Sequence, residues 1–357
     1  MGALAQRIGC SMDDITDMSC NLNPMGPMPD LEAYIRANTG RIGSLPEPDA
    51  GTMVTAYAQY HDMDPQRVIA GNGTTAFIYT LPAALASKNV LIAGPTYADY
   101  RDGCIMNNTP FAFWLADKSR NFQLDTEGIS ATLSRSDNAI DTVIICNPNN
   151  PTGTLVEQGR LVALVEEHPG VFFVIDESYL PFTDHGEAMS LARETGFPNL
   201  VVLSSMSKIF TIPGLRTGFL SAHPDVVKRF MAYYQPWSVN ALAQAAVVHL
   251  LENRETTEAF VSRSRSFMKE EKALFYETMS RCSGIKLFPS TTYFVLAELL
   301  KGTSAVEVCR IVGNERMLIR NCANFHGLSD RFVRFSLKDR KSNTALAAAL
   351  KSIEAIH

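Results

Sequence analysis

The first two thirds of the chain alternate between short, unbroken apolar runs and stretches with apolar residues at helical spacing. Apolar runs of this length are typical of strands buried on both faces, as in a mostly parallel sheet that helices cover. Helical spacing predicts a helix from Ala76 to about Ala86. The predicted strands are 68–70, 90–93, 111–115, 142–146, 171–175 and 200–203. The pattern therefore indicates an α/β fold with a mostly parallel central sheet.

The character of the sequence changes after Pro236. Helical spacing dominates 238–282, and Ser238 or Asn240 is the expected cap of the first helix. Shorter apolar runs then predict strands at 285–288, 293–296, 317–320 and 332–335, and a closing helix at 344–356. We therefore expect a large domain over 42–237 and a smaller α+β domain over 238–357. The N-terminal segment, 1–41, is expected to pack on the smaller domain or on a partner subunit.

Polar residues follow the ends of several predicted strands. In open α/β sheets, ligands bind just outside the carboxyl ends of the strands. We therefore expect the strand-end residues to form one pocket. These residues are Gly71–Thr75, Tyr97, Asn150, Asp176, Tyr179 and Ser205–Lys208.

Composition excludes several classes of protein. The chain has 357 residues, 46% of them hydrophobic and 19% charged, which suits folded domains rather than a disordered chain. No apolar run approaches the ~18 residues that span a bilayer, and the start of the sequence lacks a signal-peptide core. A net charge of −5 without a Lys/Arg cluster argues against nucleic acid as a partner. Seven scattered cysteines, with no C-x-x-C pair and no zinc spacing, predict a reduced, cytoplasmic protein without a metal site.

Two motif interpretations fail because their partners are missing or misplaced. Gly71–Ala76 fits the G-x-G-x-x-[GA] pattern of dinucleotide folds, but no acidic residue follows at the required distance of about 20 residues. Ser205–Lys208 fits the S-x-x-K of penicillin-recognising enzymes, and 136–138 supplies an S-D-N, but the order is reversed and no K-T-G exists. The glycine loop still suits a phosphate, because glycines admit a close approach and a helix N-terminus offers free N–H groups.

The strand-end residues can meet every requirement of a pyridoxal phosphate (PLP) site. PLP needs a lysine for a Schiff base, a carboxylate beside the pyridine nitrogen, donors for the phosphate, and groups that orient O3′ and the ring. Lys208 and Asp176 fill the first two requirements, and Asn150 and Tyr179 can donate to O3′. The expected phosphate-binding residues are Gly73, Thr74, Thr75, Ser205, Ser207 and Arg216.

Four motifs carry a resemblance to a known family. They are N-P-T-G at 150–153, D-E-S-Y at 176–179, S-x-S-K at 205–208 and P-G-L-R-x-G at 213–218. This order resembles fold-type I PLP enzymes of the class I and II aminotransferase family. The resemblance implies that Lys208 forms the Schiff base, that Asp176 pairs with the pyridine nitrogen, and that Asn150 and Tyr179 donate to O3′. It also implies a ring-stacking Tyr97, a phosphate ligand in Arg216, and a homodimer with active sites at the interface.

Three further stretches, 21–26, 236–243 and 318–334, narrow the resemblance. They are similar to the threonine-phosphate decarboxylases of cobalamin synthesis, which are relatives of histidinol-phosphate aminotransferases. The resemblance implies decarboxylation of L-threonine O-3-phosphate to (R)-1-amino-2-propanol O-2-phosphate. Arg334 would bind the substrate carboxylate and Arg320 its phosphate, with Asn21 and Asn150 also at the substrate. Two arginines suit one carboxylate and one doubly charged phosphate.

Other substrates and a second reaction stay open. Phosphoserine lacks only a methyl group, which a pocket distinguishes by about 1–3 kcal/mol, and a phosphonate amino acid is equally close. Lys208 and Asp176 serve transamination as well, so an aminotransferase of the histidinol-phosphate type is the alternative reaction.

The chain also departs from the decarboxylase pattern. Thr74 and Ala76 replace the two acids of the usual G-N-G-E-T-E loop, and Glu47 stands where a tyrosine usually reaches the neighbouring subunit's cofactor phosphate. Because a carboxylate repels a phosphate, we expect Glu47 to point away or its loop to be rearranged.

Overall fold

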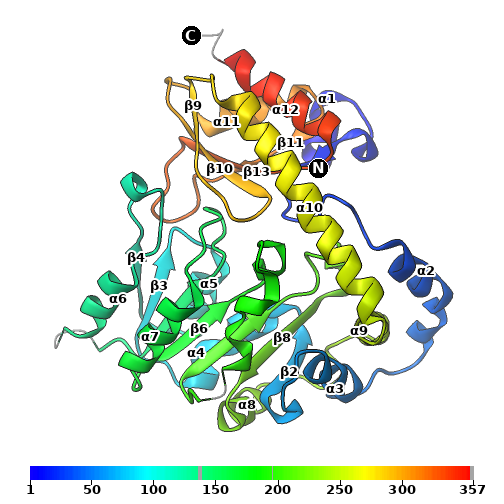
Figure 1. Ribbon diagram of the computed structural model, residues 1–357, viewed down its shortest axis with the longest axis vertical. Coiled ribbons are helices and arrows are strands. Elements are labelled where there is room, and N and C mark those ends of the chain that lie inside the picture. The colour runs from blue at the N-terminus through cyan, green and yellow to red at the C-terminus, as the bar shows by residue number, and fades with distance from the viewer. Residues whose placement is uncertain (136–138, 195, 354–357) are drawn as a thin grey trace.

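The computed structural model describes residues 1–135, 139–194 and 196–353 (Figure 1). Its larger sheet has seven strands in the order β2-β8-β7-β6-β5-β3-β4. The pairings from β7 to β4 are parallel, and β8 runs antiparallel to both of its neighbours. The mostly parallel sheet expected from the apolar runs is therefore confirmed. The strands are β2 (Val68–Asn72), β3 (Val90–Gly94), β4 (Phe111–Leu115), β5 (Thr142–Cys146), β6 (Phe172–Asp176), β7 (Leu200–Ser204) and β8 (Thr217–Ala222).

Both faces of this sheet are buried, because successive side chains of a strand enter two different cores. On β5, Ile144 packs with α4 and α8 on one face, while Val143 and Ile145 pack with α6 and α7 on the other. This arrangement explains why the central strands are apolar throughout. The helices are α3 (Gly51–Tyr60), α4 (Thr74–Leu85), α5 (Asp99–Met106), α6 (Thr126–Leu133), α7 (Gln158–Glu167) and α8 (Pro224–Met231).

A smaller antiparallel sheet, in the order β12-β13-β10-β9, lies beyond the carboxyl edge of the larger one (Figure 1). The long helix α10 (Arg254–Met279) follows α9 (Ala241–Glu252) and runs from the larger unit to the smaller one. The remaining elements are β9 (Ile285–Leu287), β10 (Phe294–Leu299), α11 (Ala305–Asn314), β12 (Arg320–Asn321), β13 (Phe332–Ser336) and α12 (Arg340–Ser352).

The N-terminal segment contacts both units. Helix α1 (Gly2–Ile8) and strand β1 (Thr16–Asp17) lie on the smaller unit, where β1 pairs in parallel with β11 (Met317–Leu318). Helix α2 (Pro29–Ala37) instead packs against α9. The segment thus passes across the opening between the two sheets.

Several sequence-based boundaries were wrong. Gly71 and Asn72 belong to β2 rather than to a loop, and α4 begins at Thr74 because Gly73 precedes it with a φ of 73°. The expected strand 317–320 is two strands in different sheets. The closing helix begins at Arg340, because the side chain of Asp339 caps it by accepting a hydrogen bond from the Ser342 amide. Strand β8 was not predicted at all.

Two predicted segments cannot be compared, because 354–356 of the closing helix and the S-D-N at 136–138 lie outside the described residues. Across the three described ranges, no helix has both the length and the apolar character needed to cross a membrane.

The strand order reverses between β3 and β5. From β3 the chain moves outward to β4, whereas from β5 it moves the other way through β6 and β7. Ligands bind at such a switch point, outside the carboxyl ends of the strands. Tyr97 follows β3 and Asn150 follows β5, so the fold places these two side chains on either side of the switch point.

Candidate active site

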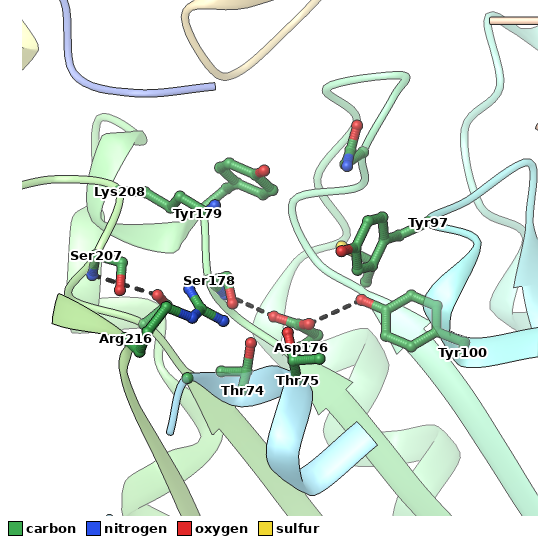
Figure 2. A pocket seen from close by; sticks show the side chains of 14 residues that line it. Thr74, Thr75, Tyr97, Tyr100, Asp176, Ser178, Tyr179, Ser207, Lys208 and Arg216 are labelled. Carbon is green, nitrogen blue, oxygen red and sulfur yellow. Dashed lines mark hydrogen bonds between the residues drawn. The ribbon is translucent and has the colours of Figure 1, made fainter. Parts of the chain in front are cut away.

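One pocket at this edge gathers every residue that the sequence analysis assigned to the cofactor (Figure 2). Tyr97 enters from one side, Lys208 and Arg216 enter from the opposite side, and Asp176 lies between them. The predicted lining residues are Gly73, Thr74, Thr75, Tyr97, Asn150, Asp176, Tyr179, Ser205, Ser207, Lys208 and Arg216. The roles assigned to these residues stay predictions.

The phosphate end of the pocket is built around Gly73 and Arg216. A Cβ atom on Gly73 would lie 2.6 Å from Nη2 of Arg216, so only glycine leaves room for the guanidinium group. A Cβ on Gly218 would lie 2.3 Å from the amide nitrogen of Thr74, which explains the close approach of β8 to the start of α4. The N-terminal amides of a helix lack partners within the helix, and they attract anions. A guanidinium group, hydroxyl groups and a helix N-terminus therefore line one small space.

Asp176 ends β6 and is almost completely buried. Its Oδ2 accepts a hydrogen bond of 2.8 Å from the phenol of Tyr100, and its Oδ1 accepts one of 2.9 Å from the Ser178 amide. Burial raises the pKa of Asp176, while these hydrogen bonds and the charge of Lys208 act in the opposite direction. The site thus favours a carboxylate that has a cationic partner.

Lys208 lies in a segment that connects to the N-terminal region, because its carbonyl accepts a hydrogen bond of 3.1 Å from the Asn23 amide. Burial, and then the charge of Arg216, lower the pKa of Lys208. A lowered pKa increases the neutral fraction of the amine, which is the nucleophilic form. Lys208 is therefore a better nucleophile at a given pH than an ordinary lysine side chain.

Asn150 and Tyr179 each have a donor left for a ligand. Oδ1 of Asn150 accepts a hydrogen bond from Nη1 of Arg334, which leaves the Asn150 amide NH₂ without a partner among the described residues. The Tyr179 oxygen accepts a hydrogen bond of 3.3 Å from Nδ2 of Asn21, so its own proton remains for another acceptor. Burial raises the pKa of Tyr179 to about 12, so the phenol keeps that proton.

Of the residues predicted at the substrate, Asn150 lines this pocket, whereas Asn21, Arg320 and Arg334 lie outside its lining. Asn21 reaches the pocket through Tyr179, and Arg334 reaches it through Asn150. Arg320 and Arg334 are directly paired between β12 and β13, so their side chains leave the same face of the small sheet. Arg334 is buried, and its Nε has no acceptor among the described residues, whereas the more accessible Arg320 donates to Asn324 over 2.8 Å.

Three lining residues were missed, namely Tyr100, Cys146 and Ser178. Cys146 ends β5 and Ser178 follows β6, so the rule of strand ends could have found both. Tyr100 follows Tyr97 by one helical turn, but the contact with Asp176 depends on how α5 packs against the sheet. No group of three or more His, Cys, Asp or Glu side chains within the described ranges could hold a metal ion.

Glu47 does not line this pocket. Its Oε2 accepts a hydrogen bond of 2.7 Å from the Thr52 amide in the first turn of α3, and its Oε1 accepts one from the Thr52 hydroxyl. Glu47 therefore serves as a local cap where the resembling decarboxylases have a tyrosine.

The pocket fits PLP. A cradle that a side chain at Gly73 would fill suits the phosphate, and a buried carboxylate at Asp176 suits a protonated pyridine nitrogen. Lys208 lies beside these groups and supplies the amine.

Comparisons with known proteins agree with this geometry. The family described as Aminotransferase class I and II matches residues 13–350. Threonine-phosphate decarboxylase of Salmonella typhimurium is 29% identical over 97% of this chain and 93% of its own. Histidinol-phosphate aminotransferase of Methanocaldococcus jannaschii is 27% identical over 94% of this chain and 88% of its own. The crystal structure of L-threonine-O-3-phosphate decarboxylase from Porphyromonas gingivalis has a TM-score of 0.85 and 32% identity, covering 96% of this chain and 100% of that one.

Proposed function

The chain belongs to the class I and II aminotransferase family of PLP-dependent enzymes, and from this premise we propose that it decarboxylates a phosphorylated amino acid, L-threonine O-3-phosphate above all. PLP, when bound, supplies an aldehyde for amines and a ring that accepts the electrons released at Cα. The product would be (R)-1-amino-2-propanol O-2-phosphate, which connects the enzyme to cobalamin synthesis. Similarity to the Salmonella and Porphyromonas decarboxylases supports this choice.

Each residue of the pocket has a proposed role in holding the cofactor or moving a proton. Arg216, the α4 N-terminus and the hydroxyls of Ser205 and Ser207 would hold the cofactor phosphate, and Asp176 would hold the proton on the ring nitrogen. Tyr97 would cover the ring face. Lys208, whose pKa is lowered, would release the cofactor to the substrate amine. Its ammonium form would then donate a proton to Cα in place of the departed CO₂.

The paired arginines are the reason for proposing a phosphorylated amino acid as the substrate. Arg334 lies within hydrogen-bond distance of Asn150, beside the pocket, and its Nε lacks an acceptor, which suits a substrate carboxylate. Arg320 leaves the same sheet face and is more accessible, so it can reach a phosphate further out. An anchored phosphate would let the carboxylate stand perpendicular to the ring, which is the orientation in which the Cα–carboxylate bond breaks.

Product analysis tests this proposal. We expect the PLP-loaded protein to release one CO₂ per O-phospho-L-threonine consumed, without added keto acid, and to form the aminopropanol phosphate. O-phospho-L-serine, run in parallel, measures how strongly the methyl group is preferred. The Lys208→Ala variant should release no CO₂ above background. Unchanged phosphothreonine after prolonged incubation would reject the proposal.

A histidinol-phosphate-type aminotransferase is the second candidate, since the Methanocaldococcus relative carries that name. Its signature is glutamate formation from histidinol phosphate and 2-oxoglutarate, without CO₂ release.

We also propose that the protein is a homodimer in a reduced, cytoplasmic compartment. The free cysteines and the exposed apolar side chains of Ile42, Leu45 and Trp237 support it.

A further inference from the structure

A second cavity lies against the segment that carries Lys208. Its volume is about 420 Å³, within the range of small-molecule sites. Met206, Ile209 and Phe210 form one wall, and the others come from the end of α3, residues 181–193, the end of α9 and the first half of α10. Ser205 lines both this cavity and the active-site pocket, so the two spaces share a wall.

Charged side chains of both signs line this cavity, and not all of them form ion pairs with one another. Three arginines, Arg193, Arg254 and Arg265, face two glutamates, Glu187 and Glu258. Within the described part of the chain, Arg254 is the one arginine of the three with an ion-pair partner, its Nε lying 2.8 Å from Oε1 of Glu258. Among the described residues, no carboxylate oxygen lies within 4.0 Å of a side-chain nitrogen of Arg193 or Arg265. The lining thus keeps two cations available.

The position of Arg265 is fixed by the surrounding chain. Its Nε donates a hydrogen bond of 2.7 Å to the carbonyl of Pro181. A Cβ atom on Gly186 would lie 1.9 Å from Nη2 of Arg265, so a side chain there would displace the guanidinium group. Burial also lowers the pKa of Arg265, which shows that the cation is partly removed from water. A held, partly dehydrated guanidinium group is a strong anion ligand.

We propose that this cavity binds a small organic anion, a phosphate or a carboxylate on a short carbon body. Arg265 and Arg193 hold the oxyanion, and Ile209, Phe210 and Leu251 contact the apolar part. Glu187 also lines the cavity, and its carboxylate opposes the anion. His61 does not compensate for that charge, because burial lowers its pKa to about 3.

A ligand in this cavity touches the residues on both sides of Lys208. Within the segment, the amides of Phe210, Thr211 and Ile212 donate hydrogen bonds of 3.0–3.3 Å to earlier carbonyls, and Asn23 donates to the carbonyls of Lys208 and Ile209. Contacts from a ligand add to these bonds, so occupancy slows local opening of the segment. The anion therefore acts on the position of Lys208 without entering the active site.

Calorimetric titration of the PLP-loaded protein tests binding with three probes: inorganic phosphate, glycerol 3-phosphate and glutarate. We expect an organic probe to bind more tightly than inorganic phosphate, and the better of glycerol 3-phosphate and glutarate identifies the anionic group. Arg265→Gln should weaken binding roughly 10- to 100-fold, because it removes a charged hydrogen bond. Glu187→Gln should tighten binding several-fold, because it removes the opposing charge. Hydrogen exchange of the peptide 205–212 should slow when the probe binds.

Lys269→Gln is the matched control. Lys269 lies on α10 one turn from Arg265, but it is exposed and pairs with Asp184 outside the cavity. The proposal is overturned if none of the probes binds, if Arg265→Gln leaves affinity unchanged, or if Lys269→Gln weakens it equally. Unchanged exchange of 205–212 in the saturated protein overturns the contact with the Lys208 segment. If the Arg265→Gln variant does not fold, Arg193→Gln serves as the test instead, because Arg193 is exposed. The proposal then requires that Arg193→Gln weakens binding of the probe.

Discussion

The phenol of Tyr100 donates a hydrogen bond of 2.8 Å to Oδ2 of Asp176, and both side chains are almost completely buried. Hydrogen bonds to the ionised form of a carboxyl group lower its pKa. Burial raises the pKa of Asp176, and the hydrogen bond from the phenol opposes that shift. Tyr100 is therefore a positioning residue for the carboxylate that the cofactor requires.

Tyr100→Phe should raise the pKa of Asp176 and lower kcat. A hydrogen bond to a charged group contributes about 1.5–3 kcal/mol, which corresponds to a loss of roughly 10- to 100-fold. Because Asp176 must be ionised, the acidic limb of the kcat profile should move to higher pH. Tyr97→Phe is the control, since the Tyr97 hydroxyl forms its hydrogen bond with Asp99, and Asp176 acts on it only as a nearby charge. Equal acidic limbs in wild type and Tyr100→Phe would contradict this role.

The lowered pKa of Lys208 predicts a response to charge substitution. Arg216 is the first charge that lowers this pKa, after burial, and Arg334 is the last of the contributing groups. Removing a nearby positive charge favours protonation, so Arg216→Gln should raise the pKa of Lys208 more than Arg334→Gln does. Titration of ¹³C-dimethylated lysines by NMR, in the cofactor-free protein, measures both shifts. A larger shift in Arg334→Gln would show that the electrostatic order is wrong.

The sheet and the strand-end residues could be predicted because both depend on local patterns. Apolar runs specify buried parallel strands, and the carboxyl ends of parallel strands share one edge, so 150, 176 and 208 had to meet there. Strand β8 could not be found in this way, because its first residues belong to the P-G-L-R-x-G motif and its edge partner β2 is distant in the chain.

Contacts that depend on tertiary packing could not be predicted from the sequence. The bond from Tyr100 to Asp176 needs α5 to lie over β6, and the pairing of Arg320 with Arg334 needs the register of two short strands. The same holds for Glu47, whose partner Thr52 is close in sequence but whose neighbour Gln244 comes from α9. Spacing alone specifies neither helix placement nor sheet register.

The two paired arginines should affect catalysis differently. Arg320→Gln should raise KM for phosphothreonine roughly 10- to 100-fold, with a smaller change in kcat, because it removes one contact to the phosphate. Arg334→Gln should lower kcat as well, because Arg334 also holds Asn150 and the carbonyl of Ser19. The exposed Arg310 on α11 provides a control with the same change of charge. Equal effects of Arg320→Gln on phosphothreonine and on threonine would remove Arg320 from the phosphate site.

Glu47 should matter for stability rather than for the cofactor. Glu47→Ala removes the acceptor of the Thr52 amide at the start of α3, where the preceding residue Ala50 provides no side-chain cap. Loss of a helix cap costs about 1 kcal/mol, so the variant should unfold at lower denaturant concentration. The hydrogen bonds from Thr52 hold the pKa of Glu47 below its usual 4.5.

A carboxyl group whose pKa is lower in the folded state stabilises the fold above its unfolded pKa and loses that effect as pH falls. The stability difference between wild type and Glu47→Ala should therefore be full at pH 7 and shrink below about pH 4.5. The dissociation constant of PLP should not change at pH 7, because Thr52 engages both carboxylate oxygens of Glu47. Tighter PLP binding in Glu47→Ala would instead place this carboxylate close to the cofactor phosphate.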